Sequence, residues 1–82
     1  MAHRAQATAI FTAISEGGEL RSLEIGPQND LSMVDPTILA IAVNSLERAE
    51  LRGTNLTREQ VPSVLRQAAT QTRLHFLDLG EN

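Results

Sequence analysis

The chain has 82 residues, a length that allows one small domain, and 41% of them are hydrophobic, which is enough for a core. Its formal net charge is −3, so it lacks the basic surface that binds nucleic acid. The absence of cysteine excludes disulfides and thiolate metal sites, and we expect neither a metal nor a cofactor. No apolar run has the length of a signal peptide or the roughly 20 residues of a membrane span. We therefore expect a cytoplasmic protein that does not bind membranes.

Apolar spacing and terminal signals predict three helices that alternate with three short strands. Gly17 and Gly18 are typical of the end of a first helix. Asp35 and Pro36 have the character of an N-cap and of the first residue of a second helix. The predicted elements are helix 6–16, strand 21–25, helix 36–45, strand 47–51, helix 60–71 and strand 75–79.

The start of the third helix carries two signals that do not coincide. Thr57 and Gln60 have the spacing of a capping box, which favours a helix that begins close to them. Pro62 lies late for such a helix, because proline is best tolerated at the first helical position. A short turn over residues 57–61, with the regular helix beginning near Pro62, would accommodate both signals.

Apolar patterns recur along the chain at steps of 26 to 28 residues. The strand pattern appears as Leu20, Leu23 and Ile25, as Leu46, Ala49 and Leu51, and as Leu74, Leu77 and Leu79. The helices share three columns, which are Ile10, Ile38 and Val64, then Phe11, Leu39 and Leu65, then Ile14, Ala42 and Ala68. We expect all of these columns in the core. A strand, a helix and a returning strand imply parallel strands, and the steady step favours a solenoid.

The segment LERAELRGTNLTREQVPSVLRQAATQTR, followed by LHFLDLGEN, resembles a leucine-rich repeat of the pattern L-x-x-L-x-L-x-x-N-x-L. The repeat length and full helices are similar to those of the ribonuclease-inhibitor-like subclass, and the resemblance extends from about Ile10 to Asn82. It implies an α/β solenoid in which a parallel sheet forms the concave face and helices form the convex face. Residues 1–82 would then be one horseshoe segment of about three units, a piece of a longer array. Members of this family mostly bind other proteins.

The repeat departs from the family pattern at two kinds of position. The resemblance implies that an Asn bonds backbone groups in the turn after each strand. That residue corresponds to Asn82 in the last unit, to Thr54 in the middle unit and, after one extra residue, to Asn29 in the first. Thr54 should form this contact more weakly than Asn, and Ala49 stands where the family has a core leucine.

Alternate residues of each predicted strand should point away from the leucines, onto the concave face. Glu24, Glu50 and Asp78 occupy the same position in the three units, so their carboxylates should form a row at about 5 Å per strand. Arg48 and Arg52 should flank Glu50 and partly neutralise it. The row would suit a basic protein partner, although charged side chains also serve simply to keep a sheet face solvated.

Phe76 completes this set, because an exposed aromatic beside charged residues is typical of an interface anchor. Packing against a neighbouring repeat or a second chain would explain it equally well. The candidate partner-binding residues are Glu24, Arg48, Glu50, Arg52, Phe76 and Asp78.

These features favour a protein-interaction module that binds a partner through the concave face. The alternative is a structural or regulatory repeat segment of a larger receptor-like or adaptor protein, without a ligand of its own. No arrangement of Ser, His and Asp suggests a catalytic triad, and three open strands offer no deep pocket, so we do not expect an enzyme. The last strand, residues 75–79, has an open edge, and we expect two chains to pair there antiparallel as a homodimer.

Overall fold

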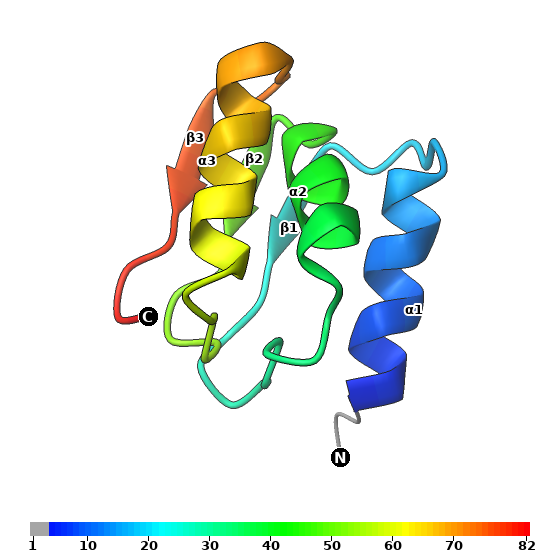
Figure 1. The fold of residues 1–82 in the computed structure, drawn as a ribbon. Coiled ribbons are helices and arrows are strands. Elements are labelled where there is room, and N and C mark those ends of the chain that lie inside the picture. Colours follow the sequence, from blue (N-terminus) through cyan, green and yellow to red (C-terminus); the bar gives the residue numbers. More distant parts are fainter. Residues whose placement is uncertain (1–3) are drawn as a thin grey trace.

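The computed structural model describes residues 4–82, in which helices and strands alternate along the chain (Figure 1). Each observed element lies within two residues of the range expected from the sequence. The elements are α1 (Arg4–Ser15), β1 (Ser22–Glu24), α2 (Pro36–Asn44), β2 (Arg48–Glu50), α3 (Gln60–Thr70) and β3 (Phe76–Asp78).

The three strands form one parallel sheet in the order β1-β2-β3, as the sequence predicts. The register places Leu23 beside Ala49 and Ala49 beside Leu77, so equivalent positions of the repeat lie side by side. The helices lie on one side of the sheet, and α2 packs between α1 and α3 (Figure 1). We call the opposite side of the sheet, which no element of residues 4–82 covers, the open face.

Both expected helix caps are present. Asp35 Oδ1 accepts hydrogen bonds from the backbone N–H groups of Thr37 at 2.8 Å and of Ile38 at 3.2 Å. Thr57 Oγ1 accepts from the Gln60 N–H at 3.2 Å, and Gln60 Oε1 accepts from the Thr57 N–H at 2.9 Å, which is a capping box. A separate helix start at Pro62 is wrong. The helix begins at Gln60, and Pro62 fits in the first turn, where its missing N–H would have no partner within the helix.

Gln60 also connects neighbouring repeats, a role that the sequence did not reveal. Its side chain is only 1% exposed, and its Nε2 donates to the carbonyl oxygens of Leu31 and Val34, each at 2.7 Å. Both carbonyls belong to the turn before α2, one unit earlier in the stack. One amide therefore caps its own helix and also satisfies two acceptors of the preceding turn.

Most predicted core residues of the middle unit are buried, with Ile38 only partly buried, and burial is less complete in the outer units. Ile10 on α1 is 48% exposed and Leu65 on α3 is 52% exposed, so the expectation that every helix column is core is wrong for these two residues. Their neighbours Phe11 and Val64 are fully buried. α1 and α3 each pack against α2 on one side only, and this one-sided packing leaves Ile10 and Leu65 exposed. For the same reason Leu20, expected to point inward, is 44% exposed.

The turns after the strands hold the polar residues that the repeat predicts. Asn82 Oδ1 accepts from the Leu56 N–H at 2.9 Å, and its Nδ2 donates to the carbonyl of Leu51 at 2.8 Å and to that of Leu79 at 3.0 Å. Thr54 is fully buried and its Oγ1 donates to the Leu51 carbonyl at 2.8 Å. Asn82 thus ties the last turn to the middle unit, whereas the Thr54 side chain bonds only within its own turn.

Candidate functional site

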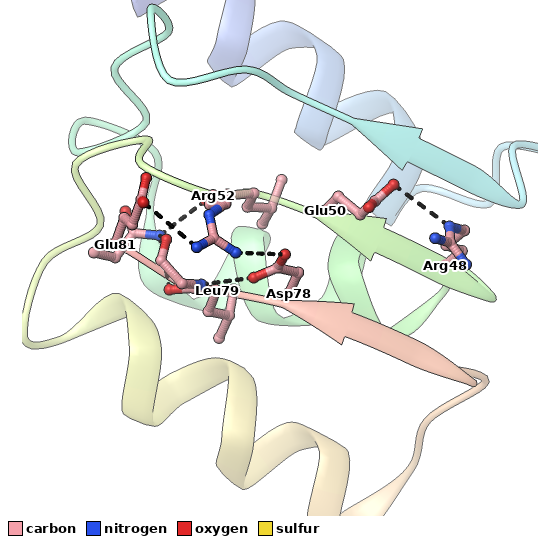
Figure 2. Close-up of polar contacts among 9 residues, drawn as sticks. Arg48, Glu50, Arg52, Asp78, Leu79 and Glu81 are labelled. Carbon is pink, nitrogen blue, oxygen red and sulfur yellow. Dashed lines mark hydrogen bonds and ion pairs between the residues drawn. The ribbon is translucent and has the colours of Figure 1, made fainter.

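The open face carries the predicted row of carboxylates. Glu24 is the Cα partner of Glu50 in the β1–β2 ladder, and Glu50 is the Cα partner of Asp78 in the β2–β3 ladder. Figure 2 shows Glu50 and Asp78 on this face, with two arginines of the central segment beside them. The row follows directly from the parallel register, because residues paired across adjacent strands project from the same side of the sheet.

Arg48 joins a carboxylate and an aromatic ring. Its Nε lies 3.4 Å from Glu50 Oε2, as expected, and its guanidinium carbon lies 4.1 Å from the centre of the Phe76 ring. Arg48 and Phe76 are Cα partners across β2 and β3, so the register brings the cation over the ring. Cation–π contacts at exposed sites contribute about 0.5–1 kcal/mol. Phe76 stays 40% exposed, so an apolar surface is held in place on a charged face.

Arg52 forms a different pairing from the one expected. Its Nη1 lies 3.4 Å from Asp78 Oδ2 and its Nη2 lies 3.4 Å from Glu81 Oε1, while no ion pair with Glu50 is present among residues 4–82 (Figure 2). The hydrogen bond and charge of Glu81, followed by the charge and hydrogen bond of Asp78, raise the pKa of the Arg52 guanidinium above its ordinary value. The only signal in the sequence is that Glu81 lies about one repeat after Arg52.

Among the residues that the structure describes, Glu24 is the member of the row without a cation. Among residues 4–82 the ion pairs of the open face involve Glu50, Asp78 and Glu81, and none involves Glu24. A depression of about 300 Å³ extends over the row. It is lined by Glu24, Ile25, Gly26, Pro27, Glu50, Arg52 and Asp78. Three carboxylates and one guanidinium line it, so its charge is negative and it suits a cationic side chain.

The described part of the chain offers no other clear chemistry. Within residues 4–82, no cluster of three or more His, Cys, Asp or Glu side chains is placed to hold a metal ion. None of the three helices is long and apolar enough to cross a membrane.

Comparisons with known proteins give the open face no further assignment. No protein-family model matches the chain, and searches of curated proteins and of solved structures found no significant match.

Proposed function

We propose that this chain is a segment of a leucine-rich-repeat solenoid and that it binds a protein partner through its open face, which would be the concave face of the horseshoe. Three features support the fold: the alternation of helix and strand, the parallel register at a step of 26 to 28 residues, and the backbone bonds of Asn82 in the last turn. The proposed family is that of the intracellular, ribonuclease-inhibitor-like repeats, and the proposed location of the protein is the cytoplasm.

The observation that carries the binding proposal is the uneven charge pairing on the open face. Arg48 and Arg52 engage the carboxylates of the two strands β2 and β3, and Glu24 on β1 has no cation among the described residues. Like charges in neighbouring strands destabilise a sheet, and a basic side chain from a partner would relieve this at the depression beside Glu24. The partner we propose is therefore a protein segment with Lys or Arg.

Phe76 supplies the apolar part of such an interface. Aromatic residues and arginine are enriched among interface residues whose removal weakens binding most. The Arg48 guanidinium restrains one side of the ring, and 40% of Phe76 stays accessible to a partner. The proposed contact has Phe76 as its apolar anchor, with the carboxylates of Glu24, Glu50 and Asp78 as its charged part.

The experiment that tests this proposal compares two charge-reversed variants in affinity capture from a cell lysate. The first carries Glu24→Arg, Glu50→Arg and Asp78→Arg on the open face. The matched control carries Glu16→Arg, Glu19→Arg and Glu59→Arg, which change the net charge equally at exposed positions outside the strands. We expect a protein that the wild type and the control retain and that the open-face variant loses, with binding that weakens as salt rises. Retention of the same proteins by all three folded chains would contradict the proposal.

The apolar surfaces at the two ends of the stack favour a second candidate function. Ile10 and Leu65 are about half exposed, which fits a repeat segment covered on both sides by further units of a larger adaptor or receptor-like protein. In that case, chains extended by one consensus repeat at each end should unfold at a markedly higher temperature. The open-face variant should then capture the same proteins as the wild type.

A further inference from the structure

We propose that the Arg52 side chain has two alternative positions on the open face and that Glu81 determines which of them it occupies. In the position that the structure shows, the guanidinium lies on the β3 side. In the other position it would lie on the β1 side, beside Glu24 and within the depression assigned above to a basic side chain of a partner. The two positions are a property of this chain alone, whereas their effect on binding rests on the proposed function.

The repeat surrounds Arg52 with the same residue types on both sides. The equivalent segments of the three units are Glu24-Ile25-Gly26, Glu50-Leu51-Arg52 and Asp78-Leu79-Gly80. The parallel ladder continues through them, because the N–H groups of Ile25 and Leu51 each donate at 2.8 Å to the carbonyl of the acidic residue on the next strand. Arg52 therefore has Gly26 on one side and Gly80 on the other, and an acidic residue precedes each glycine by two positions.

The occupied position lies on the β3 side. Arg52 Nη1 lies 3.4 Å from Asp78 Oδ2, and Nη2 lies 3.4 Å from Glu81 Oε1 (Figure 2). A methyl group on Gly80 would lie 3.3 Å from Nη1 and 3.4 Å from Cζ of Arg52, so the guanidinium packs over this glycine. The Gly80 N–H donates to Asp78 Oδ1 at 2.9 Å, which leaves Oδ2 for the arginine. A glycine and a carboxylate together thus provide the position for the guanidinium.

The β1 side offers an open position of the same kind. A methyl group on Gly26 would meet no atom of the described residues within 4 Å. Arg52 lines the depression together with Glu24 and Gly26, so its guanidinium can turn to this position within the same depression. Its side chain is 57% exposed, and exposed side chains change rotamer within picoseconds to nanoseconds. Packing therefore does not confine Arg52 to the β3 side.

The residue after each glycine makes the two sides different. Glu81 follows the glycine on the β3 side, whereas Pro27, which carries no charge, follows the glycine on the β1 side. The last turn holds Glu81 at a positive φ of 62° and brings its carboxylate to Arg52. The hydrogen bond of Glu81 is also the largest of the effects that raise the pKa of Arg52. Apart from Glu50 on its own strand, Arg52 thus has two carboxylates on the β3 side and, within residues 4–82, only that of Glu24 on the β1 side.

The position of Arg52 controls access to Glu24. While the guanidinium stays over Gly80, the place over Gly26 is open to a basic side chain of the partner. That side chain is an arginine, because the equivalent place on the β3 side holds a guanidinium of this chain. Loss of the Glu81 charge would let Arg52 divide about equally between the two places. When about half of the molecules are blocked in this way, the apparent affinity for the partner falls about twofold.

Nuclear Overhauser contacts of the Arg52 side chain test its position in the protein without a partner. In the wild type we expect contacts from the Arg52 δ protons to the α protons of Gly80 and none to those of Gly26. Glu81→Gln should add contacts to Gly26. The matched control, Glu19→Gln, makes the same charge change at an exposed position outside the strands and should keep the wild-type pattern. Contacts to both glycines in the wild type, or to Gly80 alone in Glu81→Gln, would overturn the proposal.

An alanine at each glycine gives a second test in which no charge changes. Neither Gly26 nor Gly80 has a positive φ, so both positions accept alanine. Gly80→Ala puts a methyl group against the guanidinium and should move Arg52 toward Gly26. Gly26→Ala is the matched control and should leave the guanidinium over Gly80. The opposite pattern, or the same pattern in both variants, would contradict the two positions.

Titration with a tetra-arginine peptide, followed by the amide shift of Gly26, tests the effect on binding. We expect a response at Gly26 in the wild type, weaker binding of tetra-lysine, and binding of tetra-arginine to Glu81→Gln about twofold weaker than to Glu19→Gln. No response at Gly26 in a wild type whose Arg52 lies over Gly80 would contradict the proposed function and leave the two positions of Arg52 intact. Equal affinities of the two variants would show that Glu81 does not control the site, and equal binding of tetra-lysine would contradict the preference for arginine.

Discussion

The middle and outer units of the stack share one sequence pattern and differ in burial. Leu46, Ala49 and Leu51 of the middle unit are completely buried, whereas their equivalents Leu74, Leu77 and Leu79 in the last unit are only partly buried. The difference arises because the middle strand and helix have neighbours on both sides. Burial in a repeat stack is thus a property of position as well as of residue type.

This comparison indicates which surfaces of each unit remain accessible to a protein partner. In the middle unit β2 is bonded on both sides and Leu46 and Leu51 are buried, so the sheet offers a partner the side chains of its open face. In the last unit Leu65 is 52% exposed, and Leu77 and Leu79 are only partly buried. We therefore place the proposed partner contact on the open face.

The largest expected effect comes from truncating equivalent leucines in the two units. Leu51→Ala removes a fully buried side chain and should lower the free energy of unfolding by about 2–5 kcal/mol. Leu79→Ala at the partly buried equivalent should cost less than half of that. Urea unfolding followed by circular dichroism measures both. Equal losses would show that the end of the stack is as tightly packed as its middle.

The next effect concerns the contact between units that Gln60 provides. Gln60→Ala leaves two turn carbonyls, those of Leu31 and Val34, without their side-chain donor and should cost about 1–3 kcal/mol of unfolding free energy. Gln67→Ala, a partly buried glutamine on the same helix, is the control and should change stability little. Thermal unfolding that does not distinguish the two variants would contradict the bridging role of Gln60.

A smaller effect is expected at the turn residues. Thr54→Val keeps the shape of a fully buried side chain but removes its hydrogen bond to the Leu51 carbonyl, and it should cost about 1 kcal/mol. Asn29→Ala in the first unit removes a longer bond of 3.3 Å at a more accessible position and should cost less. Denaturant midpoints of the two variants give the ranking, and the reverse order would argue against a stronger turn in the middle.

The smallest effect is the coupling between Arg48 and Phe76. A double-mutant cycle with Arg48→Met and Phe76→Leu should give a coupling free energy of about 0.5–1 kcal/mol. A coupling of zero would mean that the cation over the ring does not restrain it in solution.

Much of this structure could be predicted because the same apolar pattern recurs three times along the sequence. The step of 26 to 28 residues determines which residues align, so the row formed by Glu24, Glu50 and Asp78 followed without coordinates. Periodicity does not specify which repeat lies at an end, so the prediction that Ile10 and Leu65 are core residues is wrong. Periodicity also does not predict which residues a long, exposed side chain contacts. Arg52 reaches Glu81 only because the last turn, with Glu81 at a positive φ of 62°, brings that carboxylate within range.

Amide hydrogen exchange across the three strands tests the difference between the middle and outer units most directly. Ala49 in the central strand should exchange slowly, since β2 is bonded on both sides. Within residues 4–82, Leu77 and Glu24 direct their amides away from β2, so both should exchange faster than Ala49. Equal protection of all three amides would contradict the account.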